Sequence, residues 1–221
     1  MLLALMALFV FSTQYVNAQN YEIEYRLQIA PEFFDEECKD MGYDVPKEIV
    51  NMMTDNLNKA KIIYDVQLSE DQMNILFNKS KSDSVANMMG ATMDVSYFAP
   101  DFNFYVNYAK HECYVRQTVK GKDYLVKESG SYDTKYAPSE GSKTILGHEC
   151  KLMKSENFDM WYATDMPYET KVFKGVPGLV LQMDRGKYSF VAVSFKESDK
   201  QVTTPQNIEK ITGEEFKKLQ E

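Results

Sequence analysis

The segment Tyr21–Ile29 alternates between apolar and polar residues without a break. Its odd-numbered residues are apolar and its even-numbered residues are polar, which is the pattern of a β-strand with one face in a core and the other in water. Similar segments recur at intervals of about ten residues, with turn-forming residues between them. They are Ile62–Leu68, Gln72–Phe77, Phe102–Tyr108, Cys113–Val119, Tyr124–Lys127, Thr144–Met153, Phe158–Ala163, Gly178–Met183 and Tyr188–Phe195. This spacing predicts a mainly β protein with a few helices (α+β), whose curved antiparallel meander sheet forms an open half-barrel.

Two segments carry signs of helices instead. Asp44 and Pro46 are expected to open one helix after the first strand, because proline is tolerated in a first turn. Near the C-terminus, Thr212 and Glu215 have the spacing of a capping box, which predicts a short final helix. The apolar residues assigned to one face of the first helix are Ile49, Val50, Met52, Met53, Leu57 and Ala60. Three other segments are expected to be irregular, the second being a loop or a short helix: Pro31–Tyr43, Ser80–Ala91 and Ser129–Ser142.

The first residues form a nearly continuous apolar run, Met1–Phe11. This run is too short to span a bilayer, which takes about 20 residues. With small residues at Val16 and Ala18, it predicts a signal peptide of residues 1–18, although no Lys or Arg precedes the run. We therefore expect a single mature domain, residues 19–221, that is periplasmic or secreted after cleavage near Ala18. No later apolar run reaches membrane length, so the mature chain is expected to have no transmembrane segment.

The chain is acidic, with 33 Asp and Glu against 25 Lys and Arg and a formal net charge of −8. A surface of this sign repels polyanions, so nucleic acid is not expected among the partners. We interpret the acidity as a source of solubility rather than as an acidic binding face.

The sequence holds three cysteines and two histidines, and the tripeptide His-Glu-Cys occurs twice, at 111–113 and 148–150. Residues two apart on a strand share a face, so each histidine can point the same way as its cysteine. Three outcomes remain open if the two strands meet. Cys113 and Cys150 form a disulfide; His111, Cys113, His148 and Cys150 bind zinc or copper; or the cysteines are unpaired core residues. Cys38 is either the odd one out or the partner of one of the other two. The disulfide and the core thiols are favoured over the metal, because a long segment separates the two tripeptides.

Three motifs follow one another in the second half of the chain: Ile145–Leu152 with its glycine and cysteine, Trp161–Thr164, and Gly175–Leu181. In this order they resemble the GLPGLI family of exported bacterial proteins, with Val176 and Val180 as conservative replacements in the signature. The resemblance implies an exported protein and no known activity. The order of hairpins is also similar to the LolA-like lipoprotein-carrier fold, a curved open sheet with helices across its concave side.

The signature has a simple physical interpretation as a type II turn, in which Pro177 presets φ and Gly178 accepts a positive φ. A close approach of the backbone to a ligand would need the same glycines. We therefore name Trp161, Tyr162, Gly175, Pro177 and Gly178 as candidate ligand-binding residues.

The sequence carries no recognisable catalytic set. Both histidines belong to expected strands, no Gly-x-Ser-x-Gly elbow occurs, and no phosphate-binding loop occurs. We expect a non-enzymatic envelope protein that has no cofactor. Its ligand is expected to be apolar or peptidic: a hydrophobic small molecule, a lipid or a peptide. The alternatives are a metal-handling protein and an interaction module of an outer-membrane assembly, with another envelope protein as its partner.

Overall fold

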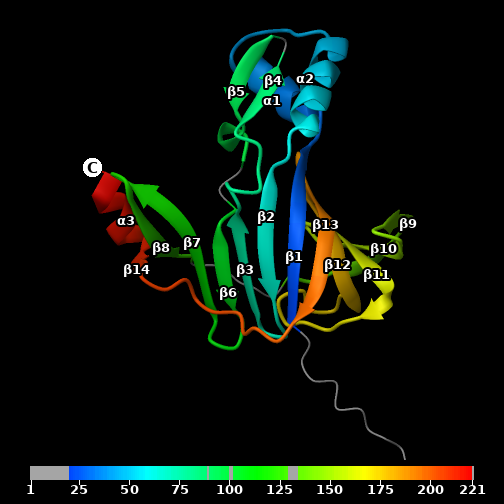
Figure 1. The fold of residues 1–221 in the computed structure, drawn as a ribbon, viewed down its shortest axis with the longest axis vertical. Coiled ribbons are helices and arrows are strands. Elements are labelled where there is room, and N and C mark those ends of the chain that lie inside the picture. The colour runs from blue at the N-terminus through cyan, green and yellow to red at the C-terminus, as the bar shows by residue number, and fades with distance from the viewer. Residues whose placement is uncertain (1–19, 89, 100–101, 129–133, 221) are drawn as a thin grey trace, which may run out of the picture.

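A computed structural model describes residues 20–88, 90–99, 102–128 and 134–220, so the expected signal peptide, residues 1–18, lies outside the described residues. A large curved sheet of twelve strands dominates the fold and stays open at both edges (Figure 1). Its strands are β1 (Asn20–Ile29), β2 (Ile63–Leu68), β3 (Gln72–Phe77), β6 (Phe104–Asn107), β7 (Glu112–Val119), β8 (Lys122–Lys127), β9 (Ala137–Ile145), β10 (His148–Lys154), β11 (Asp159–Pro167), β12 (Gly178–Arg185), β13 (Tyr188–Ser198) and β14 (Glu209–Thr212). The mainly β architecture with a curved open sheet is therefore confirmed.

The sheet consists of two meanders that meet at β1. Strands β1, β2, β3, β6, β7 and β8 follow one another on one side, and β9 to β13 follow one another on the other. Antiparallel pairing of β1 with β13 joins the two halves. One pair departs from the expected antiparallel pattern, because β14 lies parallel to β8 at the edge of the sheet.

The alternating pattern of β1 correctly predicts which of its side chains are buried in the core. Ile23 is 1% exposed, and it lies opposite Val66 on one side and Phe195 on the other. Directly opposite residues share a face of the sheet. The same row continues across the following strands through Ile75, Phe104, Val115 and Val126.

A small cap stands at one end of β1 and β2 (Figure 1). It comprises α1 (Glu32–Asp40), α2 (Lys47–Lys59), a short 3-10 helix η1 (Val95–Tyr97) and the two-stranded sheet of β4 (Val85–Met88) and β5 (Ala91–Asp94). Arg26 of β1 donates from Nη2 to the carbonyl oxygens of Asn58, Lys59 and Ala60 at 2.5, 3.1 and 3.1 Å. These are carbonyls that the last turn of a helix leaves without intrahelical partners, so Arg26 ties α2 to the sheet.

The helix expected after Pro46 is confirmed as α2, but one residue of its proposed apolar face is wrong. Met52 is 43% exposed, whereas Thr54 is buried and its hydroxyl donates to the carbonyl of Val50 at 2.9 Å. The final helix is also confirmed, as α3 (Gly213–Gln220). Its capping box forms, because the Thr212 amide donates to Glu215 at 2.7 Å and the Glu215 amide donates to Thr212 at 3.2 Å.

Each of the three segments expected to be irregular contains regular structure. Pro31–Tyr43 contains α1, whose acidic surface hides a small buried face of Phe33, Phe34 and Cys38. Ser80–Ala91 contains β4 and the start of β5. Ser129–Ser142 includes the first part of β9, and its residues 129–133 lie outside the described residues. The sequence missed β9 because this edge strand is exposed over most of its length and shows no alternation. The expected strand Thr144–Met153 is split between β9 and β10 by a turn at Leu146–Gly147, where φ is 51° and 87°.

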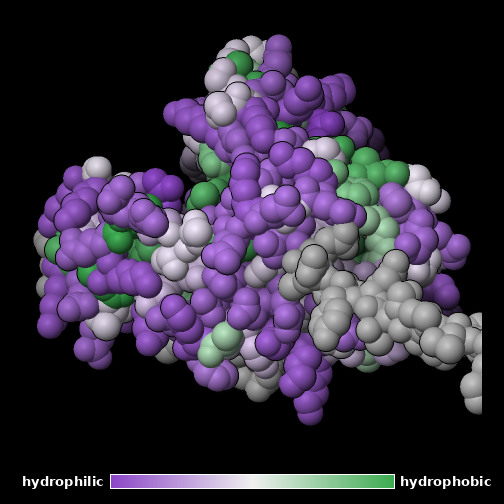
Figure 2. All heavy atoms as spheres, turned by 60° about the horizontal axis from the view of Figure 1, so that its bottom comes forward, coloured by the Kyte–Doolittle hydropathy of each residue, from purple (hydrophilic) through white to green (hydrophobic). Residues whose placement is uncertain are grey.

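At the other end of the sheet, β7, β8, β14 and α3 form a wing that bends away from the rest (Figure 1). Two small apolar clusters hold it: one around Leu125, which includes Tyr105 of β6, and the other around Phe216. The face of the molecule in Figure 2 is mainly hydrophilic, and one of its smaller hydrophobic areas lies on the wing. None of the helices in the described ranges is long and apolar enough to cross a membrane.

Candidate functional site

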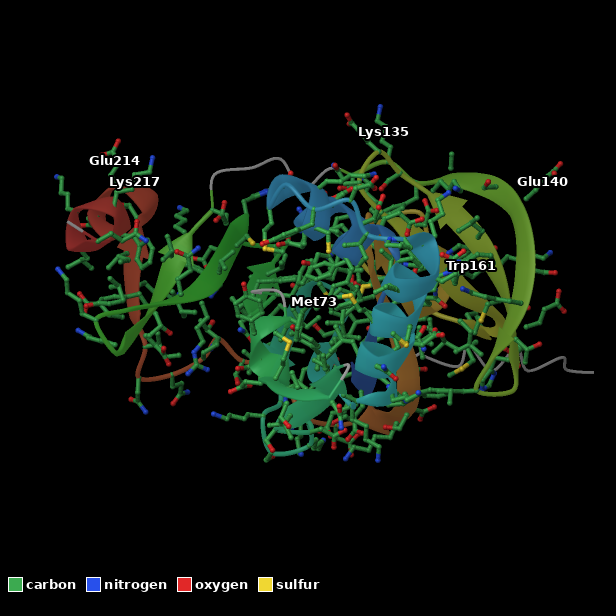
Figure 3. All side chains as sticks on the ribbon, turned by 90° about the horizontal axis from the view of Figure 1, so that it is seen from above. Met73, Lys135, Glu140, Trp161, Glu214 and Lys217 are labelled. Carbon is green, nitrogen blue, oxygen red and sulfur yellow. The ribbon has the colours of Figure 1, made fainter. Side chains whose placement is uncertain are left out.

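A groove of about 930 Å³ lies between the two halves of the curved sheet. Met73 of β3, Phe104 of β6 and Val115 of β7 line one wall, and Met160 of β11 and Met183 of β12 line the other. Figure 3, seen from above, shows Met73 near the middle of the molecule, between the wing and the strands of the second meander. Apolar side chains thus cover most of a space whose size falls in the range of ligand sites in proteins.

The strand register explains why these side chains come together. Phe104 lies opposite Val115, and Met160 lies opposite Met183. Opposite residues of an antiparallel pair point to the same face, so each pair presents two apolar side chains to the groove. The methionines lend this lining an adaptable shape, because their side chains are unbranched and rotate freely.

Aromatic rings build the end of the groove nearest the cap. The ring of Phe102 lies 4.8 Å from the ring of Phe190 and 6.1 Å from that of Tyr188, both in edge-to-face contact. Phe33 of α1 reaches the same cluster, 5.9 Å from Tyr188. Helix α1, which the sequence did not predict, therefore helps to enclose this end.

A loop that precedes the signature motif contributes Phe173 and Val172 to the groove. Phe173 is 4% exposed. The Thr170 hydroxyl donates to the carbonyl oxygens of Ser69 and Glu70 at 3.0 and 2.9 Å, and the Lys171 amide donates to Glu70 at 2.6 Å. These bonds fasten the loop to the turn between β2 and β3, so the position of Phe173 is fixed by the first meander.

The interpretation of the signature as a type II turn is wrong, because that turn requires a positive φ at Gly178. Gly178 does not have a positive φ; the positive value in this segment belongs to Gly175, at 91°. What requires glycine at 178 is close packing. A Cβ there would lie 2.2 Å from the carbonyl oxygen of Ala163 and 2.9 Å from Cδ2 of Tyr162.

Three charged residues lie among the groove-lining residues: Glu128, Arg185 and Lys187. Lys187 is paired, with its Nζ 2.9 Å from Glu36 and 4.0 Å from Glu37 of α1. Tyr136 also lines the groove, and burial raises the pKa of its hydroxyl to about 12. That hydroxyl therefore remains a neutral hydrogen-bonding group at any physiological pH.

Trp161 belongs to a polar network outside the groove. Adjacent residues of a strand point to opposite faces, so Trp161 turns away from Met160 and from the groove. Its Nε1 donates to Asp184 at 3.1 Å, and Nζ of Lys143 lies 3.8 Å from the centre of its ring. Figure 3 shows Trp161 beside the strands of the second meander, apart from Met73. A structural role accounts for these contacts.

None of the five candidate ligand-binding residues from the sequence lines the groove: Trp161, Tyr162, Gly175, Pro177 and Gly178 all lie elsewhere. The sequence also missed Arg185, Phe102 and Phe158, which do line it. The sequence did contain one indication of Arg185 as a groove residue. Met183 and Arg185 are two apart on an expected hairpin, which places an arginine on the same face as an apolar core residue.

Of the three outcomes left open for the cysteines, the sheet order contradicts the Cys113–Cys150 disulfide and the disfavoured metal set, because the two strands do not meet. Cys113 lies on β7 and Cys150 on β10, with seven strands between them, and all three cysteines are reduced and buried. His111 precedes β7 in a turn, with a φ of 52°, and His148 instead contacts Asp165 at 2.9 Å. Within the described ranges, no group of three or more His, Cys, Asp and Glu side chains could hold a metal ion.

Fold and groove together define a mainly β protein with a large open sheet that curves around an apolar groove. No protein-family model and no curated protein matches the chain. Two solved structures with some likeness to it are those of PNGF-II in space groups C2 and P21, with TM-scores of 0.48 and 0.47 and sequence identities of 16% and 18%. Each comparison covers 91% of this chain but only 32% or 33% of the other, so this chain spans about a third of the length of those structures.

Proposed function

We propose that this chain is an exported, non-enzymatic protein of a bacterial cell envelope that binds an elongated apolar ligand in the groove between its two meanders. The observation that carries the proposal is the groove itself, about 930 Å³ in volume and lined mainly by methionine, valine and aromatic side chains. An apolar surface of this kind gains stability when a ligand displaces its water.

The groove is formed before a ligand binds, because the surrounding structure holds its walls in place. Antiparallel strands form much of both walls, and hydrogen bonds hold the loop with Phe173 in place. A site carried by a regular scaffold is preorganised, so little ordering is needed when the ligand enters. The resemblance to the GLPGLI family and to the lipoprotein-carrier fold agrees with an exported binding protein, and both remain part of the proposal.

A neutral fluorescent probe, N-phenyl-1-naphthylamine, tests this function on the mature chain, residues 19–221. We expect enhanced fluorescence with saturable binding in the micromolar range. The variant Val115→Asp places a carboxylate on the groove wall, and it should abolish most of the binding, because burying a charge beside an apolar ligand is unfavourable.

Val193→Asp is the matched control. Val193 is 41% exposed on β13 and is not a groove residue, so the same substitution should leave probe binding unchanged. Thermal unfolding of both variants shows whether each remains folded. Absence of saturable binding by the unmodified chain, or equal binding by the two folded variants, would contradict the proposed site.

A further inference from the structure

The groove ends at an arginine whose charge is held in place by aromatic rings. Arg185 is the last residue of β12, two positions after Met183, so both side chains point to the groove face of the sheet. Its guanidinium carbon lies 5.3 Å from the ring centre of Phe102 and 5.3 Å from that of Phe158. All four of these side chains line the groove.

The two rings orient the guanidinium without neutralising it. Contact with aromatic faces stabilises a cation, but it leaves the N–H groups along the edge of the guanidinium plane available as donors. Arg185 itself is exposed, whereas Met183 beneath it is 7% exposed. The cation therefore stands at the mouth of the groove, above its apolar interior.

No carboxylate of the described residues forms an ion pair with Arg185. Its neighbour Lys187 differs, because Glu36 and Glu37 of α1 already surround that ammonium group. The two other arginines of the chain are also engaged, Arg116 with Asp123 and Arg26 with the end of α2. In a chain with net charge −8, an arginine left without a carboxylate at the mouth of an apolar groove points to an acceptor that comes from outside.

The remaining carboxylate of the described lining, Glu128, belongs to the opposite wall. It directly follows β8, and its amide donates to the carbonyl of Cys113 at 3.0 Å. Cys113 pairs with Val106, two residues beyond Phe104, and so lies toward the end of β6 that is remote from the cap. Glu128 and Arg185 thus belong to opposite walls of the groove.

We propose that Arg185 recognises the carboxylate of a fatty acid whose hydrocarbon chain occupies the groove; this inference rests on the proposed apolar binding function. One planar guanidinium matches one carboxylate through two parallel N–H···O bonds. A single acyl chain suits a groove of about 930 Å³. The ligand enters with its tail along Met183 and Met160 and its head group at the rim.

Binding of dodecanoate and of 1-dodecanol to the mature chain tests this inference, since the two share a chain length and differ in charge. Displacement of N-phenyl-1-naphthylamine reports both affinities. We expect dodecanoate to bind at least tenfold more tightly than dodecanol, a difference of about 1.4 kcal/mol. Arg185→Gln should remove this preference, because the loss of affinity should be at least several-fold larger for dodecanoate than for dodecanol.

Arg116→Gln is the charge-matched control, because Arg116 lies outside the groove, where it pairs with Asp123. It should retain the preference for dodecanoate. Equal affinities for the two amphiphiles, or an equal loss of preference in both variants, would overturn the role of Arg185 while leaving the groove as an apolar site. If the unmodified chain binds neither the neutral probe nor dodecanol, the proposed function itself is refuted.

Discussion

The side-chain amide of Asn58 pairs with the backbone of Ile29 as a neighbouring β-strand would. Its Nδ2 donates to the Ile29 carbonyl at 2.8 Å, and its Oδ1 accepts from the Ile29 amide at 2.8 Å. Ile29 is the last residue of β1 and Asn58 lies in the last turn of α2, so one side chain satisfies both backbone groups and docks the helix at the end of the strand.

Replacement of Asn58 by alanine should lower the free energy of unfolding by about 2 kcal/mol, because it leaves two partly buried backbone groups without partners. Urea denaturation measures this loss. Asn56→Ala is the control on the same helix, since Asn56 only accepts an exposed bond from Lys59 at 2.9 Å. A change of less than about 0.5 kcal/mol is expected there, and equal losses in the two variants would show that the Ile29 pairing contributes nothing.

Gly178→Ala should destabilise the chain by about 2 kcal/mol or more, because the added methyl group would overlap the backbone of Ala163. Gly213→Ala provides the comparison: no atom approaches its Cβ position within 4 Å, and it opens α3, where alanine is favourable. Thermal melts of the two variants should therefore move in opposite directions or by clearly different amounts. A Gly178→Ala protein as stable as the parent would refute the close-packing explanation of the signature.

The difference between Gly178 and Gly175 illustrates what sequence reasoning could reach. The Gly-x-Pro-Gly pattern indicated a special backbone, and the structure contains one, but at Gly175 rather than Gly178. Pattern rules describe the turn by its own residues. The contact that requires glycine at 178 comes from Ala163 on another strand, and no local pattern contains it.

The ion pairs of Glu22 should make the free energy of unfolding depend on pH. Hydrogen bonds and ion pairs from Lys196, at 2.7 Å, and then from Lys200, at 3.0 Å, lower its pKa from 4.5 to about 2. A lowered folded-state pKa adds stability above the unfolded pKa, and this contribution is lost as the pH falls from about 4.5 to about 2.

The stability of the parent chain and of Glu22→Gln should therefore differ at pH 7 and converge near pH 2. The difference is expected to stay below about 1 kcal/mol, because both lysines are largely exposed and water screens the pairs. Urea denaturation across this range measures it, with a parallel series in about 1 M salt, where the difference should shrink. A difference that grows toward low pH would have the wrong sign for this mechanism.

The three cysteines should titrate as three thiols per chain after denaturation under non-reducing conditions, because none forms a disulfide in the structure. In the folded protein they should react slowly with a thiol reagent, since Cys38, Cys113 and Cys150 are 8%, 9% and 0% exposed. Burial also raises the pKa of the Cys150 thiol, which makes its reactive thiolate scarcer. A count of one thiol in the denatured chain would reveal a disulfide and contradict the three reduced cysteines of the structure.

The sequence predicted much more of the fold than of the site. Alternation identified β1 and most of its neighbours, because one face of each is buried and the other is wet. It could not identify β9, which is exposed on both sides, or α1, whose buried face is only three residues wide. The groove depends on which strands become neighbours, and the pairing of β1 with β13 brings the second meander to face the first. Nothing in the local pattern around Met73 or Met160 encodes that pairing.

The pairing of β1 with β13 also determines when the whole sheet can form during synthesis of the chain. Strand β1 is the first element in the described part of the chain, yet its partner along one edge, Tyr188–Ser198, is synthesised more than 150 residues later. A nascent chain that stops short of Tyr188 keeps that edge open and leaves Ile23 and Tyr25 each without one of two cross-strand partners. The central seam of the sheet can therefore close only when synthesis of the chain is almost finished.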